Sequence, residues 1–429
     1  MNLTQLIETN KAEFYQALAK VMAVKSVKGP KASQAPFGIG PKEALLTVLE
    51  IAKSYGFETK MIADAVGYAQ LGQGSEYIGV VGHLDVVAAR GKWTYPPFQL
   101  TNKNGTFYGR GILDNKGPIM ACLFALKLLK EQHLPLKRPI RIIFGTDEES
   151  GSHDLPLYLK QEAPPLFGFT PDCKYPVVYG ERGIVHYAIT MPFSQTQLQR
   201  LGEIIGDQAS DHVPDLLRTT VDEKVIEVAG KRAPSNAPEL GINAISLLAN
   251  RLGSLLPEQL GEYFSWLADM FDEQHHGQRL GLDFSDEESG RLLLTPYRLV
   301  KESNGITVKL AIRYPISVNE EQLTTTIKKN WLPNSQLQVT RRLKSSYFPK
   351  TDAHVKQLTT VYEQVMGGVA EPVTTTGATY ARFMPNLVAF GPSFPGQKGI
   401  AHKEDEFMTE VDLLKNLEIY LRALTVLAC

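Results

Sequence analysis

Short apolar runs alternate with helical patterns in the first part of the chain, and this alternation restricts the fold more than any other feature. Residues 5–24, 42–55 and 118–132 carry apolar side chains at helical spacing. Residues 77–81 and 139–145 are short, apolar and rich in β-branched side chains, which is typical of buried strands. Strands that alternate with helices favour a mostly parallel sheet covered by helices on both faces. The sequence therefore predicts an α/β fold.

The composition indicates a globular protein with more than one domain. At 429 residues, the chain is longer than one hydrophobic core usually accommodates. Apolar residues make up 43% and charged residues 21%, with a formal net charge of −1, so no basic surface points to nucleic acid or to an anionic membrane. No stretch approaches the roughly 18 apolar residues of a membrane span. We expect a protein without nucleic-acid or membrane partners.

The cysteines and the N-terminus bear on the cellular compartment. The three cysteines are odd in number and widely spaced, so they predict neither a disulfide framework nor a cysteine zinc site. The N-terminal segment is polar and helical in pattern and lacks the apolar core of a signal peptide. The sequence therefore predicts a cytoplasmic protein.

Five short segments with acidic and histidine side chains follow strands or strand-like runs. Because ligands of a parallel sheet gather outside the carboxyl ends of its strands, we expect these segments to meet. Two imidazoles and several carboxylates are about what two adjacent divalent cations need. The segments are VVGHLDVV (80–87), YGRGILDNKGP (108–118), IIFGTDEESG (142–151), FTPDCKYPV (169–177) and AHKEDEF (401–407).

The chemistry of these side chains predicts a ligand set for two metal ions. His83 and His402 would each bind one cation through an imidazole nitrogen. Asp114 would bridge both, since a carboxylate has two oxygens suited to ions about 3.5–4 Å apart. Glu149 and Asp172 would each complete one ligand set. Mixed imidazole and carboxylate ligation favours zinc, although cobalt and manganese are compatible with it.

Two further acids have predicted roles beside the metals. Asp85 lies two residues after His83, so both side chains face the same side of an extended strand. Asp85 is therefore expected to orient His83 through a hydrogen bond. Glu148 remains as the acid that is not needed as a ligand. It is expected to act as the general base that activates water and later protonates the leaving amine.

The middle of the chain has a different character from the two ends. Residues 183–346 form an α+β series that contributes none of the five segments, and the helical pattern resumes before His402. Within it the patterns predict a helix over 195–206 and one strand over 219–229. We expect a catalytic domain split between 1–182 and 347–429, and an inserted domain over 183–346.

The five segments resemble those of the M20 metallopeptidase family, particularly its bacterial, carnosinase-like dipeptidase branch. The resemblance extends to PELGINA (238–244), AIRYP (311–315) and TYARFMPN (379–386). It implies a zinc-exopeptidase type of catalytic domain with an inserted lid, two zinc ions, a small peptide substrate and a monomer. It also implies a cis peptide bond after Asp114, and it assigns the metal ligands, Asp85 and Glu148 the roles given above.

On the substrate side the chain departs from the family pattern. Pro234 stands where relatives carry a lid histidine that stabilises the oxyanion, and proline donates no hydrogen bond. Asp211 stands where relatives use an asparagine. His212, beside it, is expected to be an exposed loop residue, although it could supply the missing donor if the segment shifts by one residue.

The expected contacts to the substrate carboxylate are partly retained. Arg313 and Arg382 are both present, and either could hold a carboxylate in a bidentate pair. The resemblance places Arg313 in the site. The glycine-rich turn that would present backbone N–H groups is reduced to Gly377 between Thr376 and Ala378.

Three functions follow from these observations. The first, which we favour, is a zinc-dependent dipeptidase in which Arg313 holds the substrate carboxylate. The second is a related amidohydrolase, an N-acyl amino-acid deacylase or desuccinylase. The third is a metal-binding pseudo-enzyme weakened by Asp211 and Pro234. The retention of Glu148 favours an active enzyme, because that residue is needed neither for folding nor for ligation.

Overall fold

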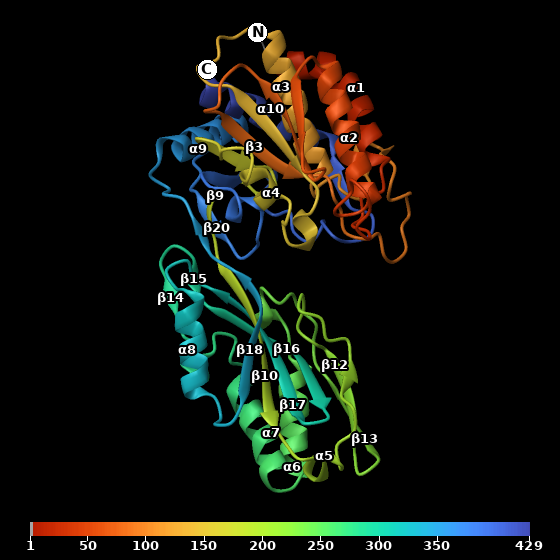
Figure 1. Ribbon diagram of the computed structural model, residues 1–429, viewed down its shortest axis with the longest axis vertical. Helices are drawn as coiled ribbons and strands as arrows, with labels where there is room; N and C mark the ends of the chain where they lie inside the picture. Colours follow the sequence, from red (N-terminus) through yellow and green to blue (C-terminus); the bar gives the residue numbers. More distant parts are fainter. Residues whose placement is uncertain (1–2) are drawn as a thin grey trace. The chain divides into compact units, whose positions relative to one another are not determined.

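The computed structural model describes residues 3–429, which divide into two compact units (Figure 1). Unit 1 comprises the described residues up to Tyr179, then Phe348–Val373 and Gly377–Cys429. Unit 2 comprises Gly180–Tyr347 and Thr374–Thr376. None of the helices among the described residues combines the length and the apolar character that a membrane crossing requires.

Unit 1 is built on a sheet with the strand order β1-β2-β6-β3-β7-β21-β9. Its central strands β6, β3, β7 and β21 run parallel to one another, whereas β1, β2 and β9 pair antiparallel with the strands beside them. The mostly parallel α/β sheet expected from the sequence is thus confirmed. Its strands are β1 (Glu58–Ile62), β2 (Val66–Leu71), β3 (Ile78–His83), β6 (Ile140–Gly145), β7 (Phe167–Thr170), β9 (Val177–Glu181) and β21 (Leu387–Phe390).

Alternate side chains of the strands enter different cores. Ile142 of β6 packs in the large core with the long helices, whereas its neighbour Ile143 packs in a smaller core with helix α4 and the segment around Tyr380. This alternation follows from the period of two in a strand. The helices of unit 1 are α1 (Leu3–Met22), α2 (Ile39–Ser54), α3 (Lys116–Glu131), α4 (Leu155–Leu159), α9 (Ala353–Met366) and α10 (Glu410–Ala428).

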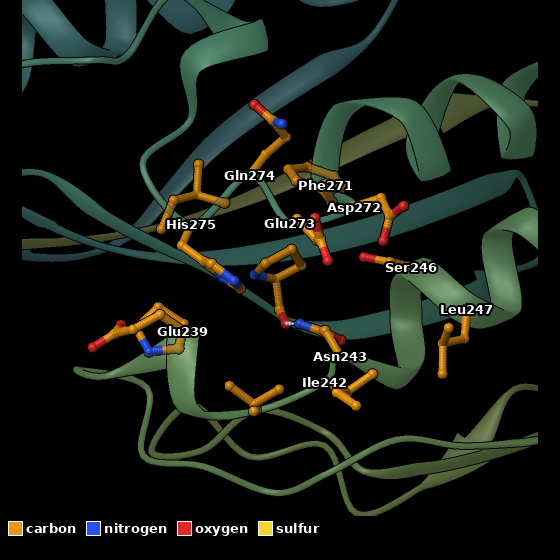
Figure 2. Close-up of a pocket in the computed structure, with 15 residues that line it drawn as sticks. Glu239, Ile242, Asn243, Ser246, Leu247, Phe271, Asp272, Glu273, Gln274 and His275 are labelled. Atoms are coloured by element: carbon orange, nitrogen blue, oxygen red, sulfur yellow. Dashed lines mark hydrogen bonds between the residues drawn. The ribbon is translucent and has the colours of Figure 1, made fainter.

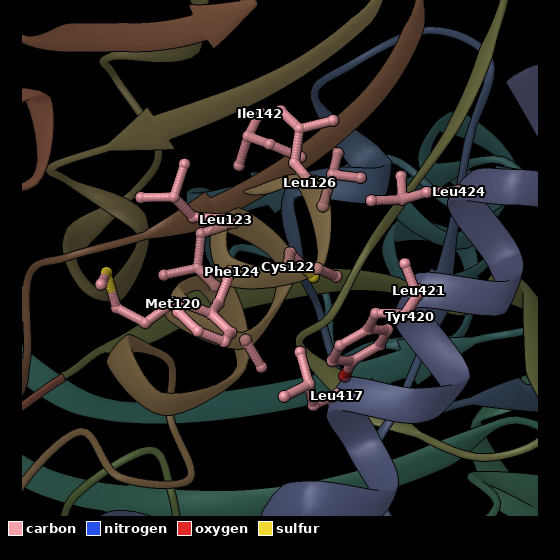
Figure 3. Close-up of a cluster of buried hydrophobic side chains, with 14 of the residues drawn as sticks. Met120, Cys122, Leu123, Phe124, Leu126, Ile142, Leu417, Tyr420, Leu421 and Leu424 are labelled. Carbon is pink, nitrogen blue, oxygen red and sulfur yellow. The ribbon is translucent and has the colours of Figure 1, made fainter. Parts of the chain in front are cut away.

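Helix α3 lies in the middle of the large core, and every residue from Lys116 to Leu129 is buried. One side of the helix contacts the sheet, and Figure 3 shows the packing of its apolar side chains beside Leu417, Tyr420, Leu421 and Leu424 of helix α10. A helix that buries side chains around its whole circumference must be covered on all sides. The start of α3 is thereby fixed beside the ends of the central strands.

This packing predicts a large effect of truncating Leu421, which is 1% exposed. Leu421→Ala should lower the free energy of unfolding of unit 1 by about 2–5 kcal/mol, because the cavity cannot close fully between two helices. The matched change Val426→Ala, at a position 44% exposed on the same helix, should cost less than about 0.5 kcal/mol. Urea denaturation followed by circular dichroism measures both. Equal effects of the two substitutions would contradict the proposed packing.

Unit 2 contains an antiparallel four-stranded sheet with the order β16-β17-β10-β18. Val185, Tyr187 and Ile189 of β10 point into a core shared with helices α6, α7 and α8. The expected inserted α+β segment is thus present. Its main elements are β10 (Gly183–Pro192), α6 (Ala244–Leu255), α7 (Glu258–Phe271), β16 (Leu293–Glu302), β17 (Gly305–Tyr314), α8 (Glu320–Asn330) and β18 (Gln336–Leu343).

Two local predictions in unit 2 were wrong. The helix expected over 195–206 is only the short α5 (Gln195–Leu198), because the amide of Gly202 donates instead to Thr220 O. The single strand expected over 219–229 is a hairpin, β12 (Leu216–Val221) and β13 (Lys224–Ala229), whose turn residues Asp222 and Glu223 have positive φ. Neither residue signals a turn as strongly as glycine does.

The remaining elements are short and connect these layers. They are β4 (Thr101–Lys103), β5 (Thr106–Tyr108), η1 (Glu148–Ser150), β8 (Cys173–Lys174), β11 (Ile205–Gly206), η2 (Pro238–Leu240), η3 (Gln278–Leu280), β14 (Ser285–Asp286), β15 (Gly290–Arg291), β19 (Ser346–Tyr347), β20 (Val373–Thr375), η4 (Tyr380–Arg382), β22 (Pro392–Ser393) and β23 (Phe407–Thr409).

Candidate metal centre

Unit 1 brings the five predicted ligands together at the carboxyl ends of its parallel strands. His83 is the last residue of β3, Glu149 lies in η1 directly after β6, and Asp172 follows β7. Asp114 precedes helix α3, and His402 lies in the loop before β23. Because parallel strands end at the same edge of a sheet, three of these side chains share one region without any long loop.

Asp114 lies between the two imidazoles. Its Oδ1 is 3.0 Å from His83 Nε2, and its Oδ2 is 2.9 Å from His402 Nε2. The two oxygens of one carboxylate therefore face two different histidines, as a carboxylate that bridges two cations would require. The peptide bond that follows Asp114 is cis, as the family resemblance implied.

One further acid accompanies each histidine. Asp172 Oδ2 lies 3.6 Å from His83 Nε2, and Glu149 Oε2 lies 3.1 Å from His402 Nε2. Among the described residues, two overlapping groups have ligand atoms within 4.8 Å of one another, namely His83, Asp114 and Glu149, and His83, Glu148 and Asp172. Glu148 thus lines the same centre, close enough that distance alone does not distinguish a base from a ligand.

The centre concentrates negative charge in a buried place. Burial, reinforced by Asp114, raises the pKa of Asp172 to about 7. Burial also raises the pKa of Glu148, and the nearby charge of Asp172 raises it further. In the same way, burial and then the charge of Asp114 raise the pKa of Glu149. Neighbouring carboxylates do not readily all ionise, because their negative charges repel one another. A cation bound between them stabilises all of them as anions. The donor set therefore fits two divalent cations.

The two histidines respond to the same charges. Hydrogen bonds to Asp114 and Glu149 raise the pKa of His402 to about 11. Burial alone would lower the pKa of His83, but the carboxylates of Asp172, Asp114 and Asp85 hold it well above its usual value. In the metal-free protein both rings therefore carry a proton that a metal ion would have to displace.

Asp85 connects His83 with the segment that carries Glu148. His83 Nδ1 lies 2.9 Å from the main-chain oxygen of Asp85 and 3.5 Å from its carboxylate Oδ1. The carboxylate also accepts the backbone N–H groups of Glu148, at 3.2 Å, and Glu149, at 3.1 Å. Asp85 is thus placed to fix the ring of His83 and the loop after β6 at the same time.

Glu406 holds the loop of Asp114 and was not predicted as a functional residue from the sequence. Its buried Oε1 accepts N–H groups from Gly111, Leu113 and Asp114 at 2.9–3.1 Å, and its Oε2 accepts from Arg110 at 2.6 Å. The segment AHKEDEF contains Glu406, but its letters do not distinguish a buried acceptor from an exposed acid.

Asn115 is a second missed residue. Its side chain accepts from the amide of His83 at 3.3 Å and donates to the main-chain oxygen of Pro171 at 2.5 Å, so it ties the His83, Asp114 and Asp172 segments together. A β-carbon at Gly82 would stand 2.5 Å from the Asn115 side-chain oxygen. A glycine directly before His83 was the available signal, because it permits this close approach.

The predicted substrate contacts are divided between the two units. Arg382 lies in η4 of unit 1 and donates to the main-chain oxygen of Gly377 at 3.2 Å. In unit 2, Arg313 lies on β17 and donates to the main-chain oxygen of Thr376. The side chain of Asp211, also in unit 2, is 83% exposed.

The expectation for His212 was wrong, since this residue is 9% exposed rather than an open loop side chain. Its Nδ1 lies 2.7 Å from the carboxylate of Asp211, and its backbone pairs with Pro234 in an isolated antiparallel bridge. The bridge holds the segment against its neighbour and encloses the ring, a long-range pairing that the local sequence did not indicate.

The charge of the centre predicts a pH-dependent response to metal removal. With a pKa of about 7, Asp172 keeps a proton in the folded metal-free protein that the unfolded chain releases near pH 4. As the pH rises from about 4 to about 7, the metal-free folded protein therefore loses the stabilisation that this proton provides. Over the same range, protons compete less with cations for the carboxylate, so metal binding becomes stronger. The Tm difference between zinc-loaded and chelator-treated protein should be small near pH 5 and larger near pH 7.5, as measured by scanning calorimetry. A difference that is constant across this range would contradict the electrostatic description of the centre.

Comparison with known protein families gives one match over most of the chain. The model described as "Peptidase family M20/M25/M40" matches residues 79–426. A putative dipeptidase, YtjP, of Bacillus subtilis is 33% identical over 428 residues, covering 92% of each chain. The Beta-Ala-Xaa dipeptidase of Lactobacillus delbrueckii subsp. lactis is 28% identical and covers 99% of this chain and 98% of its own.

Solved structures show the same fold at lower identity. Human carnosine dipeptidase 1 has a TM-score of 0.62 at 16% identity, covering 98% of this chain and 97% of its own. The YXEP protein of Bacillus subtilis, described as a dinuclear metal-binding peptidase, has a TM-score of 0.54 at 10% identity, covering 98% of this chain and 100% of its own.

Proposed function

We propose that this chain, which belongs to peptidase family M20/M25/M40, is a metal-dependent dipeptidase. Its membership confirms the resemblance drawn from the sequence motifs. The relatives of similar length are named as dipeptidases or putative dipeptidases. The observation that carries the proposal is the position of Asp114, with one carboxylate oxygen toward each histidine.

In the proposed centre, His83 and Asp172 would hold one cation, His402 and Glu149 would hold the other, and Asp114 would be shared by both. The mixed imidazole and carboxylate donors favour zinc, with cobalt or manganese as alternatives. When bound, the two cations supply Lewis-acid polarisation of the scissile carbonyl and lower the pKa of a water molecule.

Glu148 is the proposed general base. It takes a proton from the attacking water and delivers it to the nitrogen of the leaving amine. Two features support this role. The backbone amide of Glu148 is fixed by the hydrogen bond that it donates to Asp85. Burial, together with the charge of Asp172, raises the pKa of the Glu148 carboxyl group, which brings its proton affinity nearer to that of the water and of the leaving amine.

Unit 2 is proposed to be the substrate-binding domain that the sequence predicts over 183–346. Arg313 is proposed to bind the carboxylate of the substrate, since a guanidinium offers planar, paired donors that match a carboxylate. Arg382 and Gly377 of unit 1, and Asp211 of unit 2, are further proposed substrate contacts. Because an ionised aspartate would repel a developing oxyanion, Asp211 is not assigned to oxyanion stabilisation.

A substrate panel tests the proposed activity. Zinc-loaded protein should hydrolyse dipeptides, including β-alanyl dipeptides, faster than the matching N-acyl amino acids that lack a free amine. A preference for the N-acyl compounds would indicate a deacylase instead. Absence of hydrolysis, with activity gained by Pro234→His and Asp211→Asn together, would indicate a pseudo-enzyme.

Substitution of Arg313 tests how the substrate is held. Arg313→Lys should raise KM for dipeptides by about tenfold or more with a smaller change in kcat, because lysine cannot form the bidentate pair. Arg218→Lys, an exposed position of unit 2 that pairs with Glu227 on the surface, is the matched control and should leave KM unchanged. An unaltered KM in the Arg313 variant would exclude this residue as the carboxylate contact.

A further inference from the structure

Unit 2 contains a pocket of about 560 Å³ that none of the proposed catalytic or substrate-binding residues lines (Figure 2). It lies between the segment Pro238–Asn243, the first turn of helix α6 and the segment Phe271–His275 at the end of helix α7. Its volume falls in the range of sites that bind small organic molecules, roughly 300–1,000 Å³.

The lining of the pocket combines apolar and polar groups, and its charged side chains are all acidic. Val213, Leu294 and Phe271 are buried side chains that form part of the apolar lining. The charged lining residues are Glu239, Asp272 and Glu273, and no lysine or arginine lines the pocket. Within residues 3–429 none of these three carboxylates forms an ion pair with a basic side chain.

The other titratable side chain of the lining does not offset this charge. Burial lowers the pKa of His275, against the opposing effect of Glu239, so its imidazole is neutral at pH 7. The pocket therefore combines apolar patches with a negative potential, which attracts cations and disfavours anions.

Ser246 provides an independent indication of a ligand. This residue is 5% exposed, and its hydroxyl has no hydrogen-bond partner among the described residues. In Figure 2 its oxygen points from helix α6 toward Glu273, across the pocket. A buried hydroxyl without a partner costs free energy that a bound donor would recover.

The neighbouring polar side chain is satisfied by the protein itself. Asn243 caps helix α6 by accepting from the amide of Ile245, and it donates to the main-chain oxygen of Pro296 at 2.7 Å. These bonds fix the floor of the pocket. The hydroxyl of Ser246 and the three carboxylates are left to contact a ligand.

We propose that this pocket binds a small organic cation, a protonated amine that carries an apolar group. The ammonium donates to the Ser246 hydroxyl and lies near Glu239 and Glu273, while the apolar group packs against Val213, Phe271 and Leu294. None of its lining residues is a proposed ligand of the metal centre, since every one belongs to residues 213–296 of unit 2.

Calorimetric titration of the intact, zinc-loaded protein with phenethylamine near pH 7 tests this proposal. We expect saturable binding at one site, and weaker binding of both ethylamine, which lacks the apolar group, and phenylacetate, which has the opposite charge. Ser246→Ala should weaken phenethylamine binding by about tenfold. Glu239→Gln with Glu273→Gln should weaken it by about threefold to tenfold.

The matched control is Glu262→Gln, an exposed acid of helix α7 that does not line the pocket, and it should leave the affinity unchanged. Since Glu239 and Glu273 are exposed, their amide variants test the site even if the Ser246 variant folds poorly. The proposal is overturned if phenethylamine does not bind, if phenylacetate binds equally well, or if the carboxylate variants bind phenethylamine as tightly as the wild type.

Discussion

Glu148→Gln should reduce kcat for dipeptide hydrolysis by about 10²- to 10⁴-fold while the protein retains two zinc ions. A glutamine has nearly the same shape as glutamate but cannot accept the proton of the attacking water, so only the proton transfer is removed. The backbone hydrogen bond from this residue to Asp85 does not involve the side chain and should persist in the variant. Steady-state kinetics together with metal analysis of the same sample measures both quantities.

The matched control for this substitution is Glu43→Gln, an exposed position on helix α2 of the same unit. It should change neither kcat nor the metal content. If the Glu148 variant instead loses one zinc ion, its carboxylate serves as a ligand, in agreement with its place in a group with His83 and Asp172. A variant with full activity would remove the proposed base altogether.

Asp114→Asn should reduce the zinc content and lower dipeptide hydrolysis by about 10³-fold or more. The amide retains one oxygen but loses the second anionic oxygen, so it cannot bridge the cations that His83 and His402 are proposed to hold. Since a bound cation contributes several kcal/mol to stabilisation of the transition state, its loss has an effect of this order. Zinc stoichiometry from dialysed protein and kcat/KM for a dipeptide are the measurements.

Asp64→Asn provides the comparison, because Asp64 is a surface acid of unit 1 that pairs with Lys42. Its zinc content and kcat/KM should match those of the wild type. Retention of two tightly bound zinc ions in the Asp114 variant would show that this carboxylate does not bridge them. The proposed mechanism would then need a different arrangement of ligands.

Substantial parts of the fold were predictable because they depend on local patterns. The apolar run before His83 and the run over 139–145 became the parallel neighbours β3 and β6, and the apolar residues at helical spacing after Asp114 became part of the buried helix α3. Where a local pattern was ambiguous, as over 195–206, the hydrogen bond that Gly202 donates to Thr220 of strand β12 decided the outcome. Such bonds depend on which segments meet and are not encoded by spacing.

For the candidate site, the sequence by itself determined the candidate donors, because three of them follow strands whose carboxyl ends meet at one edge of the sheet. Only the tertiary structure decided that one oxygen of Asp114 faces His83 and the other faces His402. The role of Glu406 was likewise not predictable from the sequence alone. Only the structure shows that its carboxylate is buried and accepts hydrogen bonds from three backbone amides. The physical reason is that coordination and hydrogen bonding act over a few ångströms between atoms whose residues lie up to about 300 positions apart, and only folding brings those atoms together.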